Sequence, residues 1–316
     1  MIVIVCPRCA RRHKVNRDRI PTRAKTIIAR CKACGNKFPV DFASLKSRED
    51  TGADAAPASK KRQTGARKIC VSISKGGVGK TTTAVNLSAG LALANYRVLL
   101  VDTDTQGQSA YILGKKPQAG LTELLTGELG PDETIISARK NLWLLGGGKS
   151  LAGVKRIIDK KSFGAEWTLA ESLKNIENKY DFIIIDTSPG WDQLTVNVLF
   201  YATEILIPVA LEVMPLHGLA QFMKSLGSIQ KYRQDISLKY IVPTFMDTRV
   251  RAPQQIFITL KKLYKDYICK PIRYNESLSE APSFGKTIFE FAPGCSGAVD
   301  YRELVRKVAM DDTLLR

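Results

Sequence analysis

The sequence lacks the apolar segments that a membrane or secreted protein requires. Its longest apolar runs, such as Phe182–Ile185 and Val98–Val101, are far shorter than the roughly 20 residues of a spanning helix. The start, MIVIV, runs directly into Cys6-Pro7-Arg8-Cys9 and has no basic leader or long apolar stretch of a secretory signal. We therefore expect a cytoplasmic protein without a membrane segment, whose seven cysteines are reduced or bind metal.

Acidic residues are scarce relative to basic ones. The 316 residues include 48 Lys/Arg and 30 Asp/Glu, a net charge of +18, and residues 1–66 hold 16 Lys/Arg against five Asp/Glu. Such a field attracts polyanions, so nucleic acid is the first expected partner and an acidic membrane surface the second. A solvated basic surface with no partner is the remaining alternative.

Large apolar residues are also scarce between residues 41 and 66, which favours a flexible linker. The sequence thus predicts three parts: a small domain over residues 1–40, a linker over 41–66 and a larger domain over 67–316. A unit of about 40 residues is too small to be stabilised by an apolar core alone.

Two Cys-x-x-Cys pairs can stabilise the small domain. Four thiolates at this spacing form a closed tetrahedral shell, which predicts a structural Zn²⁺ site, with disulfides and free cysteines as the alternatives. Gly35 permits the tight turn beneath the metal, Phe38 can cap it, and His13 is expected on an exposed strand. The segment resembles the short zinc ribbons of many bacterial proteins. The expected ligands are Cys6, Cys9, Cys31 and Cys34.

The larger domain alternates short β-branched apolar runs with longer amphipathic stretches. This pattern predicts an α/β fold with a doubly wound, mostly parallel sheet, in which ligands bind at the carboxyl ends of the strands. The expected strands are Ile69–Ile73, Val98–Val101, Phe182–Ile185, Glu204–Val209 and Lys239–Pro243.

A glycine-rich loop follows the first expected strand and leads into a helix expected over Ala84–Ala94. Glycines let backbone N–H groups turn towards phosphates, and the helix amino terminus adds a positive dipole. Lys80 would reach the β- and γ-phosphates, and the Thr81 hydroxyl would bind Mg²⁺. The nucleotide-binding residues expected in this loop are Gly76, Gly77, Val78, Gly79, Lys80, Thr81 and Thr82.

Carboxylates follow two further strands and complete the expected site. Asp102 and Asp104 lie at the end of the second strand, and Asp186 ends the third. We expect Asp186 to orient Mg²⁺ through water and Asp104 to position the attacking water. A single aspartate at a strand end is usually a helix cap, but three facing one phosphate loop favour a catalytic site.

With these motifs, residues 67–316 resemble ParA-type partition ATPases, of the deviant phosphate-loop family that includes MinD and the nitrogenase iron protein. The resemblance extends to Gly120–Gly127, Asn197 and Leu278–Lys286. It implies an ATP hydrolase in which two subunits sandwich ATP. By position, Lys75 is the lysine that crosses to the partner's phosphates, and Asp104 is the hydrolytic aspartate.

The sequence departs from the family beside the expected adenine pocket. The family has Ile-Pro-Arg-Asn where this chain has Ile272-Arg273-Tyr274-Asn275, whereas Pro243 and Asp247 match another part of that pocket. In the family, basic side chains on the dimer bind DNA non-specifically. Arg249 fits one such position and Ser277 replaces another. The expected DNA-binding residues are Arg249, Arg251, Lys261, Lys262 and Lys265.

The resemblance therefore predicts a nucleoid-associated homodimer that is released from DNA when a ParB-like or cargo-linked activator stimulates hydrolysis. Three alternatives have less support. A MinD-like membrane-associated ATPase needs a terminal amphipathic helix, whereas Gly297–Val308 matches the last packed helix of the partition family. A zinc-ribbon DNA-binding regulator would use nucleotide only as a switch. An iron–sulfur carrier needs paired cysteines, and Cys70, Cys269 and Cys295 are isolated.

Overall fold

The structure is a computed structural model, and it describes residues 2–5, 12–15, 26–32, 34–41, 65–161, 163–212 and 215–309. The chain divides into two compact units, Met1–Lys61 and Arg62–Arg316. Most of the predicted linker, residues 42–64, lies outside the described residues. The three predicted domain boundaries therefore stay predictions.

The first unit contains two antiparallel strand pairs. Strand β1 (Ile2–Val5) pairs with β2 (Arg12–Val15), and β3 (Thr26–Arg30) pairs with β4 (Lys37–Asp41). Gly35 has a φ of +70°, and its N–H donates to the Cys31 carbonyl at 2.9 Å, so the predicted tight turn is present. A small apolar cluster connects the two pairs and consists of Ile4, Cys31, Phe38 and Val40.

The predicted zinc site is described only in part. Cys6 and Cys9 lie outside the described residues, so the four-cysteine shell and the ribbon stay predictions. Cys31 is buried and Cys34 is half-buried. His13 lies on β2, as expected for a strand residue, but its ring is half-buried and its Nε2 lies 3.2 Å from the Cys31 sulfur.

The second unit is built on a seven-stranded sheet with the order β11-β10-β5-β9-β6-β8-β7. The edge strand β7 is antiparallel to β8, and the other neighbours are parallel, which confirms the predicted α/β doubly wound, mostly parallel sheet. The strands are β5 (Arg67–Val71), β6 (Val98–Asp102), β7 (Ile135–Arg139), β8 (Leu142–Leu145), β9 (Phe182–Asp186), β10 (Glu204–Ala210) and β11 (Ser237–Thr244).

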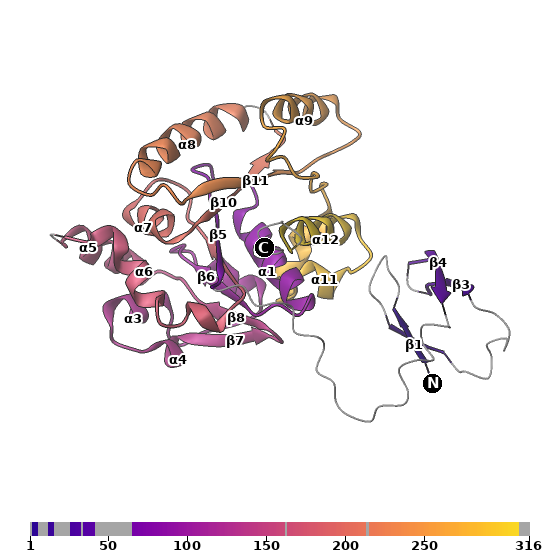
Figure 1. Cartoon of the computed structure of the whole chain (residues 1–316), viewed down its shortest axis with the longest axis horizontal. Helices are drawn as coiled ribbons and strands as arrows, with labels where there is room; N and C mark the ends of the chain where they lie inside the picture. The colour runs from indigo at the N-terminus through magenta and orange to yellow at the C-terminus, as the bar shows by residue number, and fades with distance from the viewer. Residues whose placement is uncertain are drawn as a thin grey trace. The chain divides into compact units, whose positions relative to one another are not determined.

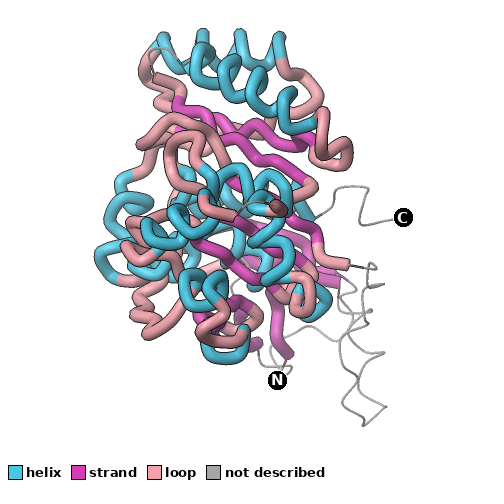
Figure 2. Tube along the Cα trace, turned by 90° about the vertical axis from the view of Figure 1, so that its left-hand side faces the viewer, coloured by secondary structure: helices cyan, strands magenta, loops and turns pink. Residues whose placement is uncertain are grey.

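Helices cover both faces of this sheet (Figures 1 and 2). They are α1 (Lys80–Leu93), α2 (Gln108–Ile112), α3 (Leu121–Thr126), α4 (Pro131–Thr134), α5 (Leu151–Asp159), α6 (Thr168–Leu173), α7 (Gln193–Tyr201), α8 (Pro215–Gln230), α9 (Arg251–Leu263), α10 (Glu276–Glu280), α11 (Ile288–Phe291) and α12 (Ser296–Ala309), with 3₁₀ turns η3 (Ala165–Trp167), η4 (Glu177–Lys179) and η5 (Ala281–Phe284).

Alternate strand residues pack into two separate cores because successive side chains point to opposite faces of a sheet. Leu99 and Val101 join the core beneath α5, α7 and α8, whereas Val98 and Leu100 join the core beneath α1 and α12. Two expectations need correction. Helix α1 begins at Lys80, four residues earlier than predicted, and the sequence analysis missed β7 and β8.

The strand register brings the functional loops to one level. Val71, which precedes the glycine-rich loop, pairs with Asp186, and Asp186 also pairs with Asp102 on the next strand. The three strands are parallel, so their carboxyl ends meet at one edge of the sheet. The loops that follow β5, β6 and β9 therefore converge there.

Candidate nucleotide-binding site

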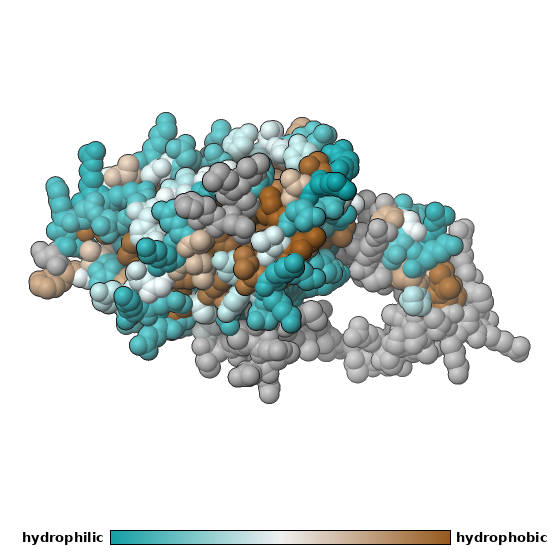
Figure 3. Space-filling view, turned by 90° about the horizontal axis from the view of Figure 1, so that it is seen from above, coloured by the Kyte–Doolittle hydropathy of each residue, from teal (hydrophilic) through white to brown (hydrophobic). Residues whose placement is uncertain are grey.

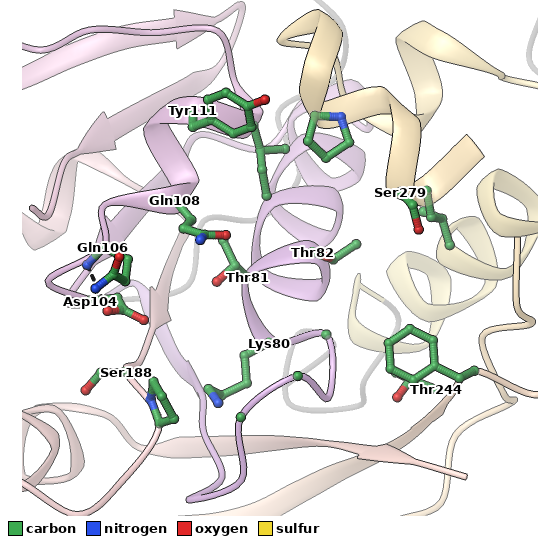
Figure 4. A pocket seen from close by; sticks show the side chains of 18 of the residues that line it. Lys80, Thr81, Thr82, Asp104, Gln106, Gln108, Tyr111, Ser188, Thr244 and Ser279 are labelled. Atoms are coloured by element: carbon green, nitrogen blue, oxygen red, sulfur yellow. Dashed lines mark hydrogen bonds between the residues drawn. The ribbon is translucent and has the colours of Figure 1, made fainter. Parts of the chain in front are cut away.

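A pocket of about 630 Å³ lies at this edge of the sheet (Figure 4). Its volume falls within the range of small-molecule sites. The glycine-rich loop and the start of α1 form one side, and segments from β11, α2 and α10 form the others. Of the predicted site residues, those lining the pocket are Gly76, Gly77, Gly79, Lys80, Thr81, Thr82 and Asp104.

The glycine-rich loop has the backbone of an anion cradle. Gly77 and Gly79 have φ values of +72° and +85°, which residues with a side chain rarely adopt. No described side chain caps the amino terminus of α1, so its first N–H groups are left for a ligand. The arrangement fits the phosphates of a nucleotide.

Lys80 is held inside this loop. It is buried, and its Nζ donates to the Lys75 carbonyl oxygen at 2.8 Å. Burial lowers the pKa of Lys80, and the charges of Asp186 and Asp104 partly offset that shift. Burial disfavours the charged form of Lys80, so an anionic ligand bound in the pocket would stabilise the ammonium.

Asp186 is a candidate magnesium-binding group. It is completely buried, and its Oδ1 has no hydrogen-bond partner among the described residues, while Oδ2 accepts from Ser109 Oγ at 3.2 Å. Burial and then the charge of Asp102 raise its pKa well above the ordinary value, with partial offset from Thr81 and Lys80. An unsatisfied buried carboxylate oxygen beside a threonine hydroxyl fits Mg²⁺, which binds few protein groups and keeps most of its waters.

The two carboxylates after β6 have different surroundings. Asp102 is completely buried and accepts backbone N–H bonds from Asp104 at 2.9 Å and Ser109 at 3.0 Å, so it organises the loop between them. Asp104 faces the pocket, and its Oδ1 accepts from the Gln106 N–H at 3.0 Å (Figure 4). Asp102 is thus a support for the loop, and Asp104 is the carboxylate available to a ligand.

Four other predicted site residues lie apart from the described pocket wall. Lys75 is exposed and does not line the pocket. Val78 is buried and its carbonyl accepts from Thr244 Oγ1 at 3.0 Å, and Pro243 is buried within β11. Asp247 lines a neighbouring polar cavity, where Arg249 forms an ion pair with it at 2.8 Å. Hydrogen bonds from Arg249 lower the pKa of Asp247 to about 2.

The predicted DNA-binding residues are all exposed and belong to α9 and its flanks. Helix α9 lies near α8 along the top of Figure 1, and it is attached to the core through Pro253 and Leu260. The view from above shows hydrophilic side chains mixed with hydrophobic ones (Figure 3). The exposed apolar residues of α9 include Ile258 and Leu263. The five basic residues on this surface are Arg249, Arg251, Lys261, Lys262 and Lys265.

The sequence analysis missed several residues that line the pocket. Phe245 has a φ of +56°, unusual for a residue with a side chain, and its ring lies next to Gly79. Tyr111 lines the pocket from α2. Lys155 lines it from α5 and forms an ion pair with Asp192, which precedes α7. None of these residues belongs to a nucleotide motif, so only the fold could reveal them.

Comparisons with known proteins agree with this geometry. Residues 66–239 match the AAA domain family. The chain is 36% identical over 248 residues to the sporulation initiation inhibitor protein Soj of Bacillus subtilis, covering 76% of this chain and 97% of Soj. It is 36% identical over 244 residues to the chromosome-partitioning ATPase Soj of Thermus thermophilus, covering 77% and 95%.

Solved structures show the same fold. Cobyrinic acid a,c-diamide synthase of Mycobacterium smegmatis, with bound ATP analogue and magnesium, is 27% identical, with a TM-score of 0.67 over 78% of this chain and 96% of that one. An ATP complex of Cyanothece McdA is 20% identical, with a TM-score of 0.69 over 78% and 97%. The protein is a P-loop ATPase of the deviant class. It belongs to the Soj/ParA family of chromosome-partitioning ATPases.

Proposed function

We propose that this protein is a partition or positioning ATPase that forms an ATP-sandwich dimer, binds DNA non-specifically, and is released when an activator stimulates hydrolysis. The observation that carries the proposal is the pocket itself. It places the glycine-rich loop, buried Lys80 and Asp104 around one cavity, beside the unsatisfied oxygen of Asp186.

In this proposal each side chain has one task. Lys80 and the N–H groups at the start of α1 bind the β- and γ-phosphates. Thr81 and Asp186 hold Mg²⁺, which neutralises phosphate charge when bound. Asp104 accepts a hydrogen bond from the attacking water and so orients it towards the γ-phosphate. The nearly complete burial of Asp104 supports this role, because little bulk water competes for its carboxylate.

The exposed side of the same loop supports dimerisation. Lys75, Gly76 and Gly77 are all exposed, and Gly76 and Gly77 have no side chain to hold a second subunit away. A Lys75 side chain from one subunit could therefore reach the phosphates of its partner. The expected result is a homodimer with two ATP molecules at its interface.

DNA is the proposed partner of the basic surface on α9. The Arg249 guanidinium is already paired with Asp247, so a DNA phosphate would have to replace that carboxylate. Arg251, Lys262 and Lys265 are exposed, and phosphate contacts require charge more than fixed geometry. The protein is thus expected on the nucleoid in the cytoplasm. None of the described helices is long and apolar enough to cross a bilayer.

We also propose that the first unit is a zinc ribbon, in which Cys6, Cys9, Cys31 and Cys34 bind Zn²⁺. The turn at Gly35 and the closeness of His13 Nε2 to the Cys31 sulfur support it, since an imidazole N–H can donate to a zinc-bound thiolate. The ribbon would contact DNA or an adaptor protein.

The test is DNA binding measured by fluorescence anisotropy on a 30-base-pair duplex, with Mg-ATP, Mg-ADP or no nucleotide. The proposal predicts binding of random duplexes in Mg-ATP and at least tenfold weaker binding in Mg-ADP. Equal binding in all three states would contradict it and favour the zinc-ribbon regulator. ATP-dependent binding to anionic lipid vesicles instead of DNA would favour the MinD-like alternative.

A further inference from the structure

Arg139, at the end of edge strand β7, connects three segments that are far apart in the sequence. Its Nη1 donates to the Leu113 carbonyl at 3.0 Å, and its Nη2 donates to the Gly285 carbonyl at 2.9 Å. Its Nε donates to Glu290 Oε1 at 2.6 Å, and Nη2 reaches Oε2 at 3.3 Å. The planar guanidinium thus fixes the ends of α2 and η5 relative to each other.

The two backbone segments that Arg139 holds are in direct contact. Gly114 and Gly285 follow α2 and η5 and have φ values of +63° and +61°. A Cβ added to Gly285 would lie 2.7 Å from Gly114 Cα, closer than real Cβ atoms come to other atoms. A Cβ at Gly114 would lie 3.1 Å from Gly285 Cα, a tight contact at a backbone angle that favours glycine. The close approach therefore depends on glycine, most strictly at position 285.

The two segments that Arg139 connects form one wall of the proposed nucleotide pocket. Tyr111 and Ile112 line it from α2, while Ser279 and Pro282 line it from α10 and η5. Figure 4 shows Tyr111 across the cavity from Lys80, with Ser279 on the facing element. The spacing between α2 and η5 thus sets the width of the pocket at the end away from Lys80.

Glu290 extends this connection to the phosphate-binding helix. Its Oε2 accepts from the Thr287 N–H at 2.8 Å at the start of α11. The next N–H, of Ile288, donates to Asn86 Oδ1 at 2.9 Å, and Asn86 Nδ2 donates to the Thr82 carbonyl at 2.8 Å. Thr82 lines the pocket, so hydrogen bonds connect the Arg139 ion pair to α1.

We propose that Arg139 is a positioning residue for the nucleotide, because it holds the Gly114–Gly285 contact and thereby the pocket wall on the nucleoside side. This inference rests on the proposed nucleotide-binding function. Arg139 itself touches no ligand in this account, and its effect is on affinity. Loss of its side chain should weaken ATP binding and raise KM, with a smaller effect on kcat.

The test compares Arg139→Met with Arg97→Met. The Arg97–Asp181 pair is a matched control: its side chains are 31% and 29% exposed, against 29% and 38% for Arg139 and Glu290. Arg97 immediately precedes β6, at the end of the sheet opposite the pocket. Affinity is measured by fluorescence titration with a mant-labelled ATP analogue, together with KM, kcat and Tm.

We expect both variants to lose stability and Arg139→Met alone to bind nucleotide on the order of tenfold more weakly, equivalent to about 1.4 kcal/mol. Arg139→Lys should recover part of the affinity, because a lysine can make one of the carbonyl contacts but not the fork. Equal affinity of Arg139→Met and Arg97→Met would overturn the inference. A wild-type protein that binds no ATP would instead contradict the proposed function.

Gly285→Ala tests the same wall with Arg139 intact. The added methyl group would meet Gly114 and force the two segments apart. It should weaken nucleotide binding at least as much as Arg139→Met. Gly153→Ala, where a Cβ would meet no atom within 4 Å, is the control and should bind normally. If Arg139→Met does not fold, weaker binding by Gly285→Ala supports the inference and unchanged binding overturns it.

Discussion

Lys80 Nζ donates a 2.8 Å hydrogen bond to the carbonyl oxygen of Lys75, five residues earlier in the same loop. The contact closes the loop around a buried ammonium, while the Lys75 side chain stays exposed on the outside. One loop thus presents one cation to its own pocket and another to the surroundings. Substitution of Lys80 and of Lys75 should therefore impair different properties of the protein.

Lys80→Ala should abolish nucleotide binding. The variant loses the one lysine that the structure holds within the loop, and with it the main charge for the β- and γ-phosphates. Isothermal titration with Mg-ATP checks this, and exposed Lys140→Ala serves as the control. Affinity within threefold of wild type would show that Lys80 is not the phosphate-binding residue.

Lys75→Ala should bind ATP almost normally and fail to dimerise. Its side chain is exposed and does not line the pocket, so its loss should leave the pocket of its own subunit intact. Sedimentation velocity with a non-hydrolysable ATP analogue measures the dimer, and DNA binding should disappear with it. A normal dimer would mean that Lys75 is an ordinary surface charge.

Asp104→Ala should bind Mg-ATP and lose at least 100-fold in kcat, the usual range for a missing proton-accepting or water-orienting group. Its backbone contacts to Gly107 and Gly148 remain, since they use the main-chain carbonyl. Single-turnover hydrolysis separates this loss from slow product release. Wild-type turnover would rule out the assigned role.

Asp186→Asn should stabilise the nucleotide-free protein and weaken Mg-ATP binding. Burial raises the pKa of Asp186 in the folded state, so the folded protein holds that proton more tightly than the unfolded chain. The free energy of unfolding therefore falls as the pH rises from about 4 through the raised pKa. At pH 7.5 the ionisable carboxyl group at this buried position is a net cost to folding. Asparagine removes that cost, and each kcal/mol corresponds to roughly 2–4 °C in Tm.

Thermal melts at pH 5 and pH 7.5 check this expectation. The Tm advantage of Asp186→Asn should be larger at pH 7.5 than at pH 5, and Mg-ATP should raise its Tm less than that of wild type. Asp159→Asn, at an exposed position on α5, is the control. A Tm difference that does not change with pH would contradict the account of the buried carboxylate.

The motifs could be predicted from the sequence because each is local. The glycine-rich loop, Asp104 and Asp186 occupy strand ends, where short continuous apolar runs end in polar residues. The remaining pocket wall could not be predicted. Phe245 and Tyr111 lie in no motif, and tertiary contacts bring them to the cavity.

The missed elements have physical reasons of their own. Strand β7 is an edge strand with half-exposed residues, so its sequence lacks the continuous apolar run of a central strand. The start of α1 at Lys80 was missed because the loop runs straight into the helix. No capping side chain precedes the helix, so the usual start signal is absent from the sequence. For Asp102, residue type and position could not distinguish a carboxylate that binds nucleotide from one that accepts backbone hydrogen bonds within its own loop.

Removal of residues 1–66 tests the role of the first unit. Residues 1–40 hold 11 Lys/Arg and one Asp, so a DNA-contacting ribbon would add phosphate contacts. Each neutralised phosphate steepens the log–log salt dependence by about 0.9 on duplex DNA. The truncated protein should therefore show a shallower slope with unchanged basal ATPase activity. Equal slopes would favour an adaptor role, in which truncation alters localisation alone.

The most direct measurement for the account as a whole is sedimentation velocity of Asp104→Ala with a short duplex, in Mg-ATP and in Mg-ADP. The variant should hold ATP without hydrolysing it, so the account predicts a DNA-bound dimer in Mg-ATP and a free monomer in Mg-ADP. A monomer in both nucleotides, or a dimer on DNA in both, would contradict the claim that ATP at this pocket controls assembly on DNA.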